Sequence, residues 1–117
     1  RQPPLPRLAL PAAPRPAVLV VGDLQLDPAT RECHRGATGI DLTTREFAVL
    51  EHLMRSPDAV GSKGAILEHV CGHESDGDPN VVEVYVGYVR KKVDAPFDRH
   101  SIVTVRGAGY RVIDDQP

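Results

Sequence analysis

Residues 79–94 read PNVVEVYVGYVRKKVD. Within this stretch four valines recur at intervals of three and four residues, a spacing that places side chains on one face of an α-helix. They are Val82, Val86, Val89 and Val93. A narrow apolar stripe of this kind needs a hydrophobic core to cover it, so the stretch predicts a helix over about residues 79–94. Either Asp78-Pro79 or Asn80 with Glu83 can begin this helix.

The opposite side of the predicted helix is unusual for a face in contact with water. It carries Val84, Gly87, Tyr88 and Lys91, where Glu, Gln and Lys are typical. Gly87 destabilises a helix by about 1 kcal/mol relative to alanine. We expect it to serve either close approach of another surface or packing against a neighbouring helix. A face with cations, a small residue and an aromatic hydroxyl suits a DNA major groove, where Lys and Arg hold phosphates and Tyr and Val meet base edges.

Two shorter helices are predicted upstream. Thr43 and Glu46 have the spacing of a capping box, in which each side chain bonds the backbone N–H of the other residue. Apolar residues then recur at helical intervals until Pro57 ends the helix. Ser62 can cap a second helix that ends at about Cys71.

Short β-strands are expected on both sides of the helices. Residues 18–21, 24–27, 32–35 and 38–42 are apolar or alternating stretches separated by tight turns, which join antiparallel neighbours. Two further strands, residues 101–105 and 110–113, flank the turn at residues 106–109. The predicted fold is therefore α+β: a four-stranded antiparallel sheet, three helices and a C-terminal β-hairpin.

The tip of the hairpin carries Arg106, followed by Gly107 and Gly109. The glycines allow a tight turn that would direct the guanidinium outward. An arginine on a narrow projecting loop is suited to a DNA minor groove, where the negative potential is concentrated. Considered alone, the hairpin favours the alternative of a plain surface hairpin with a solvated arginine.

Charge is unevenly distributed along the chain. The formal net charge is −2, but residues 18–79 hold five Lys/Arg against eleven Asp/Glu, whereas residues 80–113 hold six against three. This asymmetry favours an anionic partner for the C-terminal part.

Six of the eleven prolines lie in residues 1–17, which predicts an extended linker or arm before a domain at 18–115. No stretch is apolar for long enough to predict a membrane span, and two cysteines make no disulfide framework, which favours the cytoplasm.

Three blocks of this sequence together resemble the effector domains of OmpR/PhoB-type response regulators. The blocks are Leu42-Thr43-x-x-Glu46-Phe47-x-x-Leu50, the stretch from Pro79 to Val93, and Thr104 to Arg111. The resemblance implies a winged helix-turn-helix, with residues 79–94 as the recognition helix and the hairpin as the wing. It implies base reading by Val84, Tyr85, Gly87 and Tyr88, contacts to the DNA backbone by Arg90, Lys91 and Thr104, and a minor-groove contact by Arg106.

The same resemblance implies partners and a place in a longer protein. Residues 1–17 would be the linker to a receiver domain, which this chain lacks and which a sensor kinase would phosphorylate. The loop that would touch RNA polymerase comprises Gly72, His73, Glu74, Ser75, Asp76, Gly77 and Asp78. Members bind double-stranded DNA, commonly as head-to-tail dimers on direct repeats once their receiver domains dimerise. Without a receiver domain, this chain is expected to be a monomer in solution. No cofactor is expected. The Gly87-Tyr88 pair departs from members with arginine there, so their base preference does not carry over, and Cys71 stands where tryptophan is frequent.

Two rival interpretations follow from other residues. His69 and His73, with Cys71 between them, have the spacing of a metal pair, but Cys71 points to another helix face and no further ligands cluster nearby. Histidines at a helix end more often act as favourable partners of its dipole. No catalytic arrangement is evident, so an enzyme is not expected. A winged helix that binds protein instead of DNA would show an apolar third-helix face without cations, whereas Arg90, Lys91 and Lys92 argue for DNA.

Overall fold

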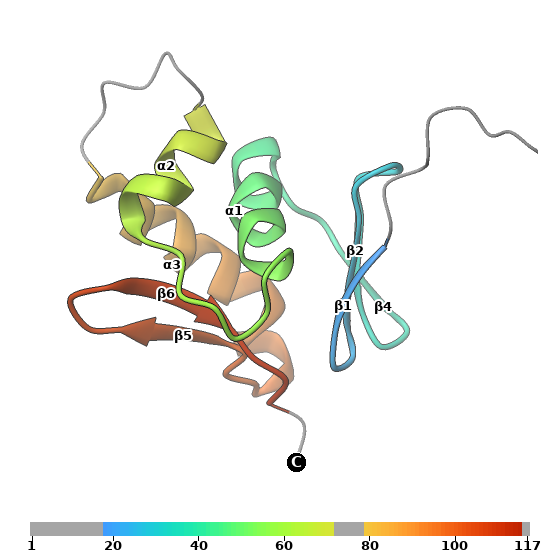
Figure 1. Ribbon diagram of the computed structural model, residues 1–117. Coiled ribbons are helices and arrows are strands. Elements are labelled where there is room, and N and C mark those ends of the chain that lie inside the picture. Colours follow the sequence, from blue (N-terminus) through green and yellow to red (C-terminus); the bar gives the residue numbers. More distant parts are fainter. Residues whose placement is uncertain (1–17, 72–78, 116–117) are drawn as a thin grey trace, which may run out of the picture.

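The computed structural model describes residues 18–71 and 79–115. Four strands come first, β1 (Leu19–Val21), β2 (Leu24–Asp27), β3 (Glu32–Arg35) and β4 (Thr38–Ile40). Three helices follow, α1 (Thr44–Met54), α2 (Lys63–Cys71) and α3 (Val81–Val93), and then a short 3₁₀ turn, η3 (Ala95–Phe97). Strands β5 (Ile102–Val105) and β6 (Gly109–Val112) form the closing hairpin, so the expected α+β fold and its order of elements are confirmed (Figure 1).

The helix boundaries have identifiable local causes. The capping box of α1 is present, since Thr43 accepts from the Glu46 backbone N–H at 3.2 Å and Glu46 accepts from the Thr43 N–H at 2.9 Å. In α2, the Ser62 hydroxyl accepts from the Ala65 N–H at 3.1 Å. Helix α3 begins at Val81 with Asn80 as its N-cap, the later of the two predicted starts. Asp78 lies outside the described residues.

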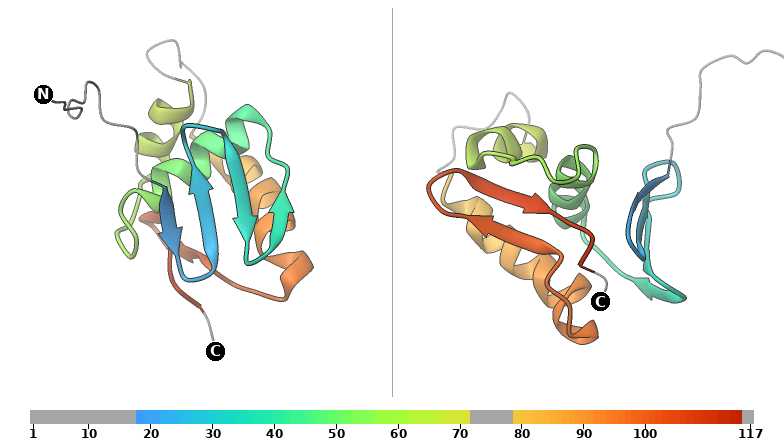
Figure 2. Two further views of the ribbon diagram at one scale, coloured as in Figure 1. Left: turned by 90° about the vertical axis from the view of Figure 1, so that its right-hand side faces the viewer. Right: turned by 60° about the horizontal axis from the view of Figure 1, so that its bottom comes forward.

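The N-terminal strands form one antiparallel sheet in the order β1-β2-β3-β4. Its inner face contributes Leu24, Leu26 and Cys33 to the core. Helix α1 packs against this face, and α2, α3 and the hairpin lie on the other side of α1 (Figures 1 and 2). The sheet therefore backs the helices and meets the C-terminal end of α3, while the turn of the hairpin lies at the opposite side of the domain.

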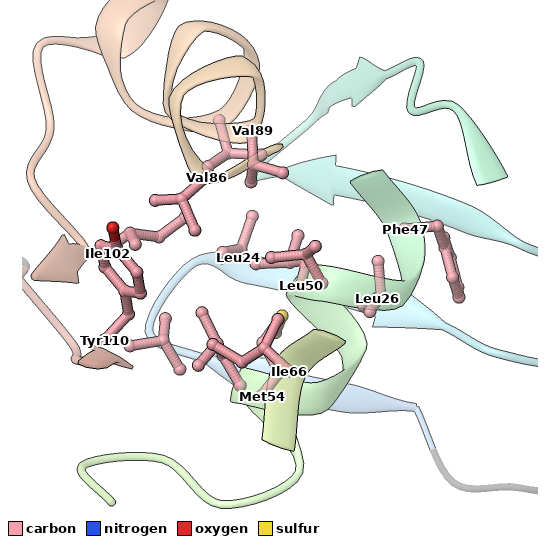
Figure 3. Close-up of a cluster of buried hydrophobic side chains, with 14 of the residues drawn as sticks. Leu24, Leu26, Phe47, Leu50, Met54, Ile66, Val86, Val89, Ile102 and Tyr110 are labelled. Atoms are coloured by element: carbon pink, nitrogen blue, oxygen red, sulfur yellow. The ribbon is translucent and has the colours of Figure 1, made fainter. Parts of the chain in front are cut away.

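The core closes around the apolar stripe of α3. All four predicted valines, Val82, Val86, Val89 and Val93, are buried at 1% exposure or less. Figure 3 shows Val86 and Val89 directed toward the same cluster as Leu50, Ile66, Ile102 and Tyr110. The stripe on which the fold prediction rested is thus confirmed as the contact between α3 and the rest of the domain.

The hairpin is anchored near its turn by the loop between α1 and α2. Gly61 and Tyr110 exchange two backbone hydrogen bonds, N to O at 2.7 and 2.9 Å. Next to this bridge, Gly109 has φ +145°, and a side-chain carbon there would overlap the Gly61 carbonyl. Glycine at 109 is therefore required sterically, because the two backbones meet at this point.

Candidate nucleic-acid interface

The outward face of α3 combines apolar, aromatic and cationic side chains. Val84 and Tyr88 are 48% and 47% exposed, among the most exposed large hydrophobic residues of the described chain. They lie one helical turn apart, with Gly87 beside Tyr88 and the exposed Lys91 one turn further along. No described part of the chain buries Val84 or Tyr88, so this face is accessible to a partner that accepts both apolar and anionic contacts.

Gly87 gives this face a gap. Among the described residues, no atom outside the helix's own backbone lies within 4 Å of the place where a Cβ of residue 87 would be. Packing against a neighbouring helix, one of the two alternatives for this glycine, is therefore wrong for the described chain. The other alternative, close approach of an external surface, stays a prediction for this glycine.

Tyr85 lies to one side of this exposed face. It is half-buried, and its hydroxyl accepts a hydrogen bond from Nη1 of Arg45 in α1 at 3.3 Å. The same Arg45 nitrogen lies 3.2 Å from the sulfur of Cys71, so this arginine joins the three helices at one point. Arg45 was not singled out from the sequence, because its partners are distant along the chain.

The hairpin and the helices enclose a groove of about 420 Å³. One side is the hairpin from Thr104 to Tyr110, which includes the exposed Arg106 in the turn. The other side carries Lys63 of α2 and Glu83 of α3, whose Nζ and Oε1 atoms lie 2.6 Å apart. Sequence reasoning did not assign these two residues to the site. The sequence feature that could have pointed to them is that each lies in the first turn of its predicted helix.

Two residues predicted to contact the DNA backbone contact each other. Arg90 Nη2 donates to Thr104 Oγ1 at 2.7 Å and to the Ile102 carbonyl at 3.0 Å, and Arg90 Nε donates to the same carbonyl at 3.2 Å. Both acceptors are neutral, so the guanidinium keeps its full positive charge beside the hairpin.

Part of the C-terminal positive charge is used inside the fold. Lys92 Nζ pairs with Glu46 at 2.6 Å, and Arg99 pairs with Asp115 at 2.6 Å and Asp23 at 2.8 Å. Burial opposes the ionisation of Glu46, but the bonds from Lys92 and from Thr43 outweigh it and hold the pKa of Glu46 below its usual value. The six basic residues of this stretch are therefore not all available to an anionic partner, whereas Lys91 and Arg106 are exposed.

The histidine and cysteine positions show a structural use. His69 Nε2 lies 3.1 Å from Oε1 of the buried Glu51, while His73, the other half of the spacing considered for a metal pair, lies outside the described residues. Among residues 18–71 and 79–115 there is no group of three potential metal ligands. In the same part of the chain, no helix has the length and apolar character needed to cross a membrane.

A recognition helix beside a projecting hairpin, both supported by a core of three helices, defines the winged helix-turn-helix class of DNA-binding domains. Residues 36–112 match the family model described as "Transcriptional regulatory protein, C terminal". The chain belongs to this family, the OmpR/PhoB-type effector domains of two-component response regulators.

Individual relatives agree with this assignment. The chain is 42% identical over 102 residues to the transcriptional regulatory protein TcrA of Mycobacterium tuberculosis, covering 87% of this chain and 40% of TcrA. It is 46% identical over 99 residues to the response regulator MprA of Mycobacterium ulcerans, covering 85% of this chain and 43% of MprA. The chain thus spans less than half the length of these relatives.

A solved structure of a DNA complex has the same fold. The RstA DNA-binding domain of Klebsiella pneumoniae, crystallised with the RstA box, superposes with a TM-score of 0.72 at 28% identity and covers 83% of this chain and 97% of that one. The family is one of transcription-factor DNA-binding domains and not a class of enzymes.

Proposed function

We propose that this chain binds double-stranded DNA in a sequence-specific manner, with α3 in the major groove and Arg106 in an adjacent minor groove. The observation that carries the proposal is the exposed face of Val84, Gly87, Tyr88 and Lys91 beside a hairpin that holds Arg106 at its turn. A major groove offers thymine methyl groups and base edges to such a face, and phosphates to its cation. The RstA complex supports the proposal, because a domain of the same fold was crystallised with its DNA box.

Within this proposal the residues divide into two groups. Val84, Tyr88 and, at the edge of the face, Tyr85 meet the bases, and the gap at Gly87 allows the helix backbone to approach them. Lys91, Arg90 and Thr104 lie toward the phosphates. Arg106 contributes through the shape and potential of the minor groove, without reading individual bases.

We further propose that the chain acts as the output part of a longer response regulator. The support is that MprA is named as a response regulator and TcrA as a transcriptional regulatory protein, and that both extend well beyond the matched part. Residues 1–17 would then link this domain to a receiver that a sensor kinase phosphorylates, and Gly72 to Asp78 would contact RNA polymerase. Both segments lie outside the described residues. On direct repeats, two copies would bind head to tail, and the isolated domain would be monomeric.

The experiment that tests DNA binding is selection of bound sequences from a random double-stranded pool, followed by titration of the selected site at several salt concentrations. Contacts to several phosphates make affinity fall steeply between about 50 and 200 mM salt, because bound counterions are released. A winged helix that binds protein would enrich no sequence and would bind DNA weakly and without preference. That result would overturn the proposal.

A further inference from the structure

The guanidinium of Arg90 bridges the recognition helix and the hairpin. From the second half of α3 it reaches strand β5, where it binds the Ile102 carbonyl and the Thr104 hydroxyl through two of its nitrogens. Its Cζ also lies 5.6 Å from the ring centre of Tyr110 in β6, the residue that pairs with Thr104 across the hairpin. One side chain of α3 therefore contacts both strands of the hairpin.

These contacts need the shape of an arginine. Two nitrogens of the planar guanidinium share one carbonyl, and one of them also reaches a hydroxyl, a geometry that the single ammonium of lysine cannot reproduce. A residue that serves a phosphate by charge alone would not require this fork. Both acceptors, the Ile102 carbonyl and the Thr104 hydroxyl, belong to strand β5 of the hairpin, and Thr104 lies two positions before Arg106.

We propose that Arg90 is a positioning residue that sets the angle of the hairpin relative to α3, so that Arg106 meets the minor groove while α3 occupies the major groove. This inference rests on the proposed function and refines it. A two-stranded hairpin is marginally stable by itself. The hairpin is held near its turn by the Gly61–Tyr110 bridge, which acts on β6, and at its base by Ile113 N donating to Ser101 O at 2.9 Å. Arg90 adds a separate link from α3 to β5, at Ile102 and Thr104.

The deciding variant is Arg90→Lys, because it keeps the positive charge and removes the fork. Arg55→Lys, at an exposed position after α1, is the matched control. Each is combined with Arg106→Ala, and affinity is measured on one selected site with A·T-rich or G·C-rich flanks. Hydrogen exchange of the hairpin amides is followed in the free domain.

In the unaltered and Arg55→Lys backgrounds, Arg106→Ala should weaken binding to A·T-rich flanks by about tenfold. In the Arg90→Lys background the same change should weaken it less than about threefold, because the guanidinium of residue 106 is no longer held in place. The salt dependence should stay unchanged, and hairpin amides should exchange faster in Arg90→Lys.

If Arg106→Ala keeps its full effect in Arg90→Lys and hairpin exchange is unchanged, the positioning role is wrong and Arg90 acts as a charge. If the domain binds no DNA or Arg106→Ala has no effect in any background, the proposed function fails instead, and hydrogen exchange alone then decides whether Arg90 holds the hairpin. Should Arg90→Lys reduce the folded population, Thr104→Val removes the hydroxyl acceptor of the same bond and should likewise speed hairpin exchange and reduce the effect of Arg106→Ala, whereas Thr104→Ser, which keeps the hydroxyl, should restore slow hairpin exchange.

Discussion

Arg35 in β3 donates to Asp94, the residue that ends α3, with Nη2 and Oδ1 3.1 Å apart. Both side chains are buried, and Arg35 also binds the Val93 carbonyl at 2.7 Å. Asp94 in turn accepts from the hydroxyl of Ser101 and from the Ile102 N–H, where β5 begins. This ion pair and the hydrogen bonds around it therefore fix the N-terminal sheet to the end of α3 and to the base of the hairpin.

Loss of this pair should destabilise the domain strongly. Arg35→Leu leaves Asp94 buried without its cation, and removal of one partner of a buried pair typically costs about 3–5 kcal/mol. Arg55→Leu removes an arginine whose side chain is 55% exposed, and its buried partner Glu51 keeps the contact with His69 Nε2 at 3.1 Å, so the loss should be smaller, about 1 kcal/mol. Urea unfolding of the two variants measures the difference. Equal losses would show that the network contributes no more than a surface pair.

The sequence predicted those parts of the fold that depend on neighbours along the chain. The capping box at Thr43, the Ser62 cap and the valine stripe of α3 are set by spacings of three or four residues, and all were confirmed. The Arg35 network could not be predicted, because three of its four partners, Val93, Asp94 and Ser101, lie 58 to 66 positions away and an arginine in a short strand resembles a solvated one.

The candidate site was predictable to the same extent. The exposed positions on α3 follow from the stripe, since opposite faces of a helix are fixed by its period. What spacing could not show is which cations are already paired: Lys92 and Arg99 counted toward a basic segment, yet each is bound to a carboxylate of another element. Spacing along the chain also could not place Lys63 in the groove, because its partner Glu83 lies 20 positions away in α3.

Gly87→Ala should separate folding from DNA binding. The Cβ would meet no described neighbour, and alanine favours a helix by about 1 kcal/mol over glycine, so the free energy of unfolding should rise by roughly 0.5–1 kcal/mol. Affinity for a selected DNA site should fall, because the methyl group occupies the gap through which the helix approaches the bases. Gly64→Ala, at an open position in α2, is the control that should stabilise without this loss. Unchanged DNA affinity in Gly87→Ala would exclude the close approach.

Glu83→Gln should strengthen DNA binding. Glu83 is 55% exposed at the groove beside the hairpin, where its carboxylate holds Lys63 and repels phosphate. The amide keeps the size of the side chain and removes its charge, so affinity should rise by about two- to fivefold and the salt dependence should become steeper by about one counterion. Glu68→Gln removes the same charge from α2 outside the groove and should change affinity less. Weaker binding by Glu83→Gln would instead indicate a direct contact of the carboxylate.

Stability should fall with decreasing pH in two stages. Burial, aided by the nearby charges of His69 and Arg55, lowers the pKa of His52 below its model-compound value of 6.5. The unfolded chain then binds the proton more readily, so the free energy of unfolding decreases as pH falls below about 6.5. The lowered pKa of Glu46 has the same sign and acts below about pH 4.5. Urea titrations from pH 8 to 3 measure both stages, and His52→Gln should flatten the upper stage while leaving the lower one intact.

Truncation of Tyr88 and truncation of Lys91 should affect DNA binding in different ways. Tyr88→Ala removes the largest exposed ring of the reading face and should change which bases a selection enriches, whereas Lys91→Ala should weaken binding to all sequences by a similar factor and lower the salt slope by about one. Tyr88→Phe tells ring contacts from hydroxyl contacts, because it keeps the former alone. If Tyr88→Ala left both affinity and preference unchanged, the exposed face of α3 would not be the reading face, since no other large aromatic side chain of the described α3 is as exposed. If Lys91→Ala altered preference as well, the division between base and phosphate contacts along this helix would have to be redrawn, with residue 91 placed deeper in the groove.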